Sequence, residues 1–104
     1  MMKIDFTKQN DLIPAIIQEE KSGKILMLGY MNKEAFKKTK QTGIVYFWSR
    51  SKQRLWMKGE TSGNTLVVKN IFVDCDQDAL LITVTLDGTN VCHTGTRTCF
   101  KEIL

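Results

Sequence analysis

The sequence predicts a single α+β domain, residues 1–104, with a mostly antiparallel, twisted sheet and one main short helix. Three observations support this fold class. The chain of 104 residues has the length of one domain. Short runs of apolar and β-branched residues alternate with polar turns, which is typical of strands. One segment, by contrast, carries helix signals at both ends.

The N-terminal part predicts a hairpin followed by the helix. Residues 14–20 and 24–31 are rich in apolar side chains and flank a Lys-Ser-Gly turn, so we expect them to pair as antiparallel strands. Asn32 is a good N-cap for a helix over residues 33–41, and Gly43 follows its C-terminal end.

The rest of the chain predicts further strands separated by polar turns. The strands are expected at residues 44–49, 55–58, 65–73 and 79–87, of which the last two form the strongest pair. Because loops carry most functional side chains, we expect the site on the intervening turns. These turns cover residues 49–54, 59–64, 74–78, 87–90 and 93–98.

Charge is unevenly placed along the chain, although the formal net charge is only +4. Residues 32–60 carry eight Lys or Arg and two Glu, whereas residues 71–88 carry four Asp and no basic residue. One part is therefore suited to anions and the other to cations. A solvated basic face beside an acidic hairpin explains the same pattern without any ligand.

Composition also restricts the class of protein. The longest apolar stretch, residues 25–31, is far shorter than the roughly 20 residues of a membrane helix. No apolar core of a secretory signal precedes the first acidic residue. Three cysteines, an odd number, favour free thiols or metal ligands over a disulfide framework. We therefore expect a soluble, cytoplasmic protein with no membrane partner.

An acidic run predicts a cation site. Asp74, Asp76 and Asp78 alternate with other residues, so an extended or gently turning backbone places the three carboxylates on one side. Such oxygens favour Mg²⁺ or Ca²⁺. An EF-hand is excluded, because Ala79 and Thr85 stand where that loop needs Gly and Glu. A hydrated hairpin tip is the alternative.

The cysteines suggest a second, softer site. Cys75 lies inside the acidic run, where extended backbone would point its sulfur away from the carboxylates. Cys92 and Cys99 flank a loop long enough for both sulfurs to meet on one ion. Three thiolates would leave a fourth zinc position open, as in a catalytic site. His93 is a conceivable fourth ligand, but extended backbone would point it away from its neighbour Cys92, so we favour a role that is not metal binding. Three buried thiols explain the cysteines at least as well as zinc, and a structural histidine is the alternative for His93.

Two segments carry the groups that bind phosphate. Residues 49–54 supply guanidinium groups, and residues 59–63 supply hydroxyls and backbone N–H groups exposed by glycine. Trp48 and Trp56 flank the first segment and are candidates to stack on a base, although aromatic residues in strands more often belong to the core.

Four motifs occur in the order YMNKEAF, YFWSRSKQRLWMKGETSGN, DCDQDALL and CHTGTRTCF. Together they closely resemble the phosphoribosyl-AMP cyclohydrolase family of histidine biosynthesis, from about Leu26 to Phe100. The resemblance implies hydrolysis of the N1–C6 bond of the adenine ring in phosphoribosyl-AMP, which gives an imidazole carboxamide ribotide with two phosphates. The sequence departs from the family at Lys52, where arginine is common, and at residues 89–91, where small residues are usual.

The same resemblance implies the cofactors and the assembly. It assigns Zn²⁺ to Cys75, Cys92 and Cys99, and Mg²⁺ to Asp74, Asp76 and Asp78, in a homodimer whose zinc ligands come from both subunits. Zinc would lower the pKa of bound water and supply hydroxide for attack on C6. His93 is the candidate to move protons as N1 leaves. The substrate-binding residues that we expect are Ser49, Arg50, Ser51, Trp56, Lys58, Gly59, Glu60, Thr61, Ser62, Gly63 and Thr94.

Two other classes remain open. A zinc-stabilised nucleic-acid-binding module suits the basic middle, but the chain has no C-x-x-C pairs and leaves a zinc position open, so we expect no nucleic-acid partner. A catalytically silent dimeric scaffold with buried thiols is the other. Metal content tests the scaffold, and a nucleotide-hydrolysis assay tests the module. Because the chain ends four residues after Phe100, we expect no fused pyrophosphohydrolase domain.

Overall fold

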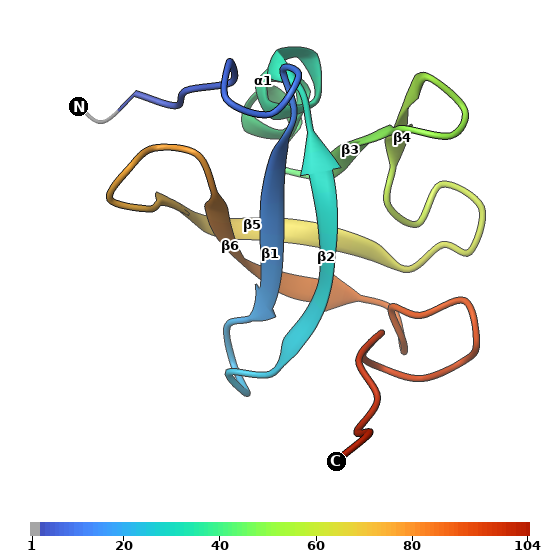
Figure 1. Cartoon of the computed structure of the whole chain (residues 1–104). Helices are drawn as coiled ribbons and strands as arrows, with labels where there is room; N and C mark the ends of the chain where they lie inside the picture. The colour runs from blue at the N-terminus through green and yellow to red at the C-terminus, as the bar shows by residue number, and fades with distance from the viewer. Residues whose placement is uncertain (1–2) are drawn as a thin grey trace.

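Two sheets and one helix make up the computed structural model, which describes residues 3–104 (Figure 1). Met1 and Met2, which the domain prediction includes, lie outside the described residues. The elements agree with the expected ranges to within two residues, and the α+β class is confirmed. They are β1 (Ile13–Glu19), β2 (Ile25–Met31), α1 (Lys33–Thr42), β3 (Tyr46–Ser49), β4 (Arg54–Met57), β5 (Thr65–Val73) and β6 (Leu80–Asp87).

The main sheet has the strand order β2-β1-β6-β5, and β3 and β4 form a separate two-stranded ribbon. Three of the four strand pairs are antiparallel, as predicted. The central pair is parallel: Ala15 of β1 lies opposite Leu80 of β6. The sheet is strongly twisted, so that β5 lies almost across β2 in the view of Figure 1. The N-terminal and C-terminal hairpins are thus joined through β1 and β6.

The helix α1 begins and ends at the expected caps. The Asn32 side chain accepts a hydrogen bond of 2.8 Å from the Ala35 N–H, and Gly43 ends the helix in the left-handed region at φ 73°. Thr39, fully buried, accepts a hydrogen bond of 2.9 Å from the Tyr46 N–H. This contact ties the helix to the start of the β3–β4 ribbon.

The ribbon is also packed closely against the main sheet. Phe47 of β3 is 1% exposed, and its ring centroid lies 5.3 Å from that of Trp56 on β4. A Cβ at Gly29 of β2 would lie 2.5 Å from the Phe47 ring, so only glycine allows this approach. Burial of a side chain of this size contributes about 1.5–3 kcal/mol. The ribbon, which carries much of the candidate site, is therefore fixed to β2 through the buried Phe47 ring.

The N-terminal segment covers the turn between β5 and β6. The Asp5 N–H donates to the Gln77 carbonyl at 2.7 Å, and Lys8 Nζ donates to the Asp76 carbonyl at 2.9 Å. Among residues 3–104, no helix is both long and apolar enough to cross a bilayer.

Candidate active site

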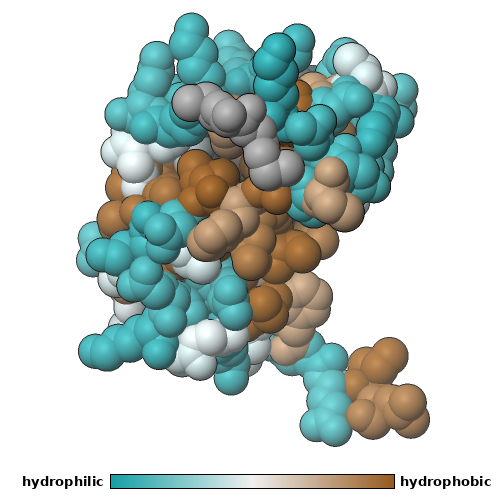
Figure 2. Space-filling model, turned by 90° about the vertical axis from the view of Figure 1, so that its left-hand side faces the viewer, coloured by the Kyte–Doolittle hydropathy of each residue, from teal (hydrophilic) through white to brown (hydrophobic). Residues whose placement is uncertain are grey.

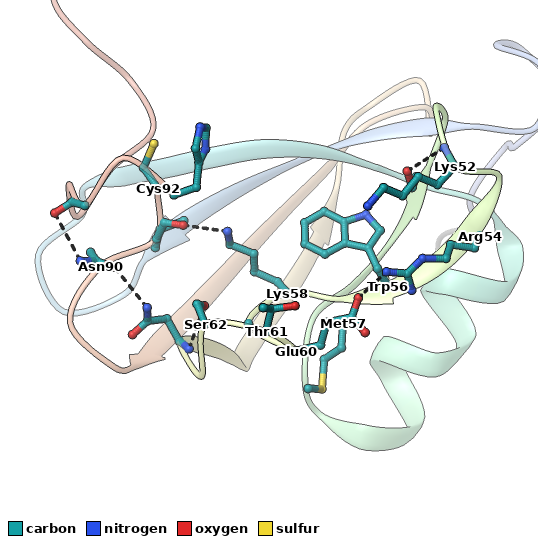
Figure 3. Close-up of a pocket in the computed structure, with 16 residues that line it drawn as sticks. Lys52, Arg54, Trp56, Met57, Lys58, Glu60, Thr61, Ser62, Asn90 and Cys92 are labelled. Atoms are coloured by element: carbon teal, nitrogen blue, oxygen red, sulfur yellow. Dashed lines mark hydrogen bonds and ion pairs between the residues drawn. The ribbon is translucent and has the colours of Figure 1, made fainter.

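A cavity of about 530 Å³ opens between the β3–β4 ribbon, the loop after β4 and the segment after β6 (Figure 3). It joins residues that lie far apart in the sequence. The predicted site residues in its lining are Ser49, Trp56, Lys58, Gly59, Glu60, Thr61, Ser62, Cys92 and His93. The lining also includes Lys52 and Arg54 of the basic segment, together with Met57, Asn64, Asn90, Val91 and Gly95.

Four of the expected substrate-binding residues lie outside this lining. Arg50 and Ser51 instead line a second cavity of about 580 Å³ on the side of β2, where the Arg50 guanidinium carbon lies 4.1 Å from the centroid of the Tyr30 ring. Gly63 and Thr94 are only sequence neighbours of lining residues. The turn between β3 and β4 therefore divides its residues between two cavities.

Cationic side chains line one part of the first cavity, as Figure 3 shows. Lys58 Nζ donates a hydrogen bond of 2.7 Å to the Val91 carbonyl, which places the ammonium between the ribbon and the segment after β6. Arg54 forms an ion pair of 2.9 Å with Glu60. Together with Lys52, these groups give the cavity the charge that a phosphorylated ligand requires.

The loop after β4 presents hydroxyls and backbone N–H groups to the same cavity. Gly59 has a φ of 90°, and a Cβ there would lie 2.4 Å from the carbonyl oxygen of Asn64, so glycine is required. Thr61 and Ser62 lie between Gly59 and Asn64 and line the cavity. Sequence reasoning selected this loop but missed Asn64 and Asn90. The sequence offers little that would identify them: Asn64 is the last residue of the GETSGN motif, and Asn90 lies in the unusual segment 89–91.

Two of the three thiols lie close enough to affect each other. Cys92 Sγ lies 3.0 Å from Thr94 Oγ1, and hydrogen bonds from the Thr94 side chain and backbone lower the pKa of Cys92 to about 6. Desolvation and then the neighbouring Cys92 raise the pKa of Cys99. The Cys99 N–H donates to the Leu26 carbonyl at 2.7 Å, which holds this loop against β2. A thiolate at neutral pH is the form that binds soft metals.

The third thiol lies at the other end of the molecule. Cys75 is in the turn before β6, whereas Cys92 follows the end of β6 (Figure 1). A strand of that length spans about 25 Å, whereas two sulfurs on one zinc ion lie within about 4 Å of each other. One chain therefore brings together two of the three predicted zinc ligands.

The acidic run forms a tight turn rather than extended backbone. Asp74 Oδ1 accepts hydrogen bonds of 3.0 and 3.1 Å from the N–H groups of Asp78 and Ala79. Desolvation is the largest single influence on Asp74 and raises its pKa, but these two hydrogen bonds, together with those of the Asp76 and Asp78 side chains, outweigh it, so the pKa is lowered. Ligand oxygens of Asp74, Asp76 and Asp78 all lie within 4.8 Å of one another, a spacing that suits one hard cation. Because the run turns, Cys75 Sγ is also 3.9 Å from Asp76 Oδ1.

The fold and the cavity define a class: small α+β proteins with a basic, glycine-containing pocket that ends beside a thiol of lowered pKa and an exposed histidine, His93. Within this class the family is shown by comparison. Residues 27–101 match the model of the phosphoribosyl-AMP cyclohydrolase family. The chain belongs to this family, whose members are hydrolases that act on a cyclic C–N bond, and the resemblance is confirmed.

The relatives are similar over nearly the whole chain. A phosphoribosyl-AMP cyclohydrolase of Solibacter usitatus is 54% identical over 95% of this chain and 79% of its own length. That of Desulfatibacillum aliphaticivorans is 50% identical over 100% of this chain and 83% of its own. The histidine biosynthesis bifunctional protein HisIE of Staphylococcus aureus (strain Mu50) is 59% identical, and this chain spans 46% of its length.

Proposed function

We propose that the protein hydrolyses the N1–C6 bond of the adenine ring in phosphoribosyl-AMP, a step of histidine biosynthesis. One observation carries the proposal: a single cavity is lined both by residues 59–62 and by Cys92 and His93. We call residues 59–63 the phosphate-binding loop. The membership of the chain in the phosphoribosyl-AMP cyclohydrolase family supports the same reaction.

The substrate fits the charges of this cavity. Its two phosphates are matched by Lys52, Arg54 and Lys58 and by the hydroxyls of Thr61 and Ser62. The rings of the substrate require an aromatic or apolar surface, and the Trp56 indole supplies one inside the cavity (Figure 3). In our proposal the adenine ring lies between this indole and the segment that carries Cys92.

We propose that a second copy of the chain completes a zinc site at the thiols. Cys92 and Cys99 supply two soft donors in one chain, and we propose that Cys75 of a second copy supplies the third. Zinc acts as a Lewis acid and lowers the pKa of water toward neutrality. In the reaction, water adds at C6, the N1–C6 bond breaks and N1 takes up a proton. His93, which lines the cavity, is our candidate to move that proton.

The acidic turn fits magnesium, with Asp74, Asp76 and Asp78 as ligands. Cys75 lies inside this turn, so any contact that brings Cys75 to the thiol pair of a second copy also brings the acidic turn to its cavity. The two metals would then occupy separate, neighbouring sites at one composite active site, where magnesium suits the substrate phosphates.

An apolar groove supports a homodimer. Figure 2 shows apolar surface gathered in the middle of one face of the molecule. A groove of about 450 Å³ is lined by Ile4 near the N-terminus and by residues of α1, β5 and β6, and Phe72 in its lining is 52% exposed. Its lining includes Val73, which directly precedes the acidic turn. A second copy that covers the groove would bury this surface next to Cys75.

Three free thiols also suit the reducing cytoplasm, where we place the reaction.

Turnover of phosphoribosyl-AMP by the purified protein tests the proposal, since opening of the purine changes the ultraviolet absorbance. We expect Cys92→Ser to abolish turnover without unfolding the protein, as judged by circular dichroism. Full activity in a folded, zinc-free Cys92→Ser protein would show that the assignment is wrong. A metal-loaded wild type that binds RNA and does not turn over the nucleotide would favour the nucleic-acid-binding module. A wild type with no metal and no turnover would favour the silent scaffold.

A further inference from the structure

A chain of hydrogen bonds connects the phosphate-binding loop to the thiol loop, residues 92–99. The Thr89 N–H donates to Asn64 Oδ1 at 3.0 Å, and Asn64 Nδ2 donates to Asn90 Oδ1 at 3.1 Å. Asn90 Nδ2 then donates to the Gly95 carbonyl at 3.3 Å (Figure 3). Asn64 directly follows the phosphate-binding loop, and Gly95 lies in the thiol loop beyond Cys92. Two segments of the cavity lining are therefore linked through two side-chain amides.

The direction of this chain is set by its two ends. A backbone N–H such as that of Thr89 can only donate, so the atom of Asn64 that faces it is the amide oxygen. The Gly95 carbonyl can only accept, so the atom of Asn90 that faces it is the amide nitrogen. The central hydrogen bond between the two amides then has one possible direction. Both amides use their oxygen and their nitrogen, a pattern that a single-function side chain cannot reproduce.

The backbone leaves space for Asn64 at two glycines. Gly88 has a φ of 147°, and a Cβ there would lie 2.1 Å from Asn64 Oδ1. A Cβ at Gly59 would meet the Asn64 carbonyl oxygen. Two segments from different parts of the sequence thus approach Asn64 so closely that neither position accepts a side chain. This packing holds the first amide of the chain in place.

We propose that Asn64 and Asn90 are positioning residues that connect the two halves of the active site. They hold the thiol loop, and with it Cys92 and His93, at a set place relative to the phosphate-binding loop. A substrate bound by its phosphates then meets the reacting groups in the correct position. The kinetic part of this inference rests on the proposed function, whereas its structural part does not. Asn90 also gives a role to the unusual segment 89–91.

Two variants break the series of side-chain hydrogen bonds at different positions. Asn90→Ala removes both hydrogen bonds of the second amide. Asn64→Asp keeps the oxygen that accepts from Thr89 and removes the nitrogen that donates to Asn90. Asn70→Ala is the matched control: Asn70 is an exposed asparagine of β5 whose amide bridges to Glu20 and Thr83, outside the cavity lining.

Hydrogen exchange followed by mass spectrometry gives the structural readout. The wild type, the two variants and the control are compared, all without substrate. The Cys92 and Gly95 N–H groups are hydrogen-bonded within the thiol loop, at 3.0 Å each, and report on its order. We expect both variants to speed exchange in residues 92–99 about tenfold, the equilibrium effect of losing one or two net hydrogen bonds. Exchange in the strands and in the control should stay at the wild-type rate.

Turnover gives the second readout. We expect kcat to fall about tenfold and KM to stay within about twofold, because the phosphate-binding groups remain. The double variant should lose no more than Asn90→Ala alone, since the links act in series. Unchanged exchange in the thiol loop, faster exchange in every strand, or a raised KM at constant kcat would each overturn the inference. If the wild type does not turn over phosphoribosyl-AMP, the proposed function fails and exchange alone decides the connection.

Discussion

The separation of Cys75 from Cys92 along β6 leads to a prediction about two defective chains. Cys75→Ala removes the thiol of the acidic turn, and Cys92→Ala removes one thiol of the loop. Because about 25 Å of strand separates the two positions, one chain cannot place both sulfurs on one zinc ion. If the zinc site is shared, a homodimer of either variant has two broken sites and should be inactive.

A mixed dimer of the two variants keeps one site whole. Its intact Cys75 comes from the Cys92→Ala chain, and its intact thiol pair comes from the Cys75→Ala chain. Random pairing makes about half of the dimers mixed, and each mixed dimer has one of two sites, so co-expression should restore roughly a quarter of wild-type activity. Each variant expressed alone should give none.

The assay needs two tags of different mass, one on each variant, and sequential affinity purification of the mixed dimers. Purified mixed dimers should then have about half of the wild-type activity and one zinc ion per dimer. Inactive, zinc-free mixed dimers of confirmed mass would refute the shared site. Activity in either variant alone would refute the role of that thiol. Neither result depends on the identity of the proton donor.

Three further predictions concern stability and metal binding. Hydrogen bonds from Arg97 and then Ser22 lower the pKa of Glu19 below its usual 4.5, so the carboxylate stabilises the fold above that pH and less as the pH falls through the lowered pKa. Glu19→Gln should therefore lower the Tm at pH 7, and the difference should vanish in acid; a constant difference would contradict this. Asp76→Asn should weaken Mg²⁺ binding, measured by titration calorimetry, and leave the zinc content unchanged; loss of zinc in proportion to activity would mean that the sites are not separate. Gly29→Ala should destabilise the fold by about 1–3 kcal/mol in urea, because the new methyl overlaps the buried Phe47 ring; an unchanged midpoint would show that the ribbon moves freely.

The elements that the sequence predicted well are those determined by neighbouring residues. The caps of α1 at Asn32 and Gly43 depend on local side chains and φ angles, and they lie where expected. The parallel pairing of β1 with β6 depends instead on how two hairpins meet, and no local pattern distinguishes a parallel from an antiparallel neighbour.

The site shows the same division between local and distant causes. The loop of residues 59–63 and the pairing of Cys92 with Cys99 follow from residue types within short segments, and four residues of this loop line the cavity together with Cys92. The place of Arg50 depends on the path of the turn between β3 and β4, and this turn carries it to a different cavity. In the sequence Asn64 and Asn90 have no feature that distinguishes them from other polar residues. The fold places Asn64 Nδ2 3.1 Å from Asn90 Oδ1. Their role depends on tertiary contacts alone.

The parallel pair β1–β6 has a consequence for how the chain folds during synthesis. Ala15 and Glu19 leave the ribosome 65 residues before their partners Leu80 and Val84. Until then the edge of β1 that does not pair with β2 is free, and this edge can pair with another nascent chain. Such late, long-range pairing gives a high contact order and slow folding. Chaperones that bind extended apolar segments should therefore engage the hairpin of residues 13–31 on stalled chains and release it once β6 has emerged.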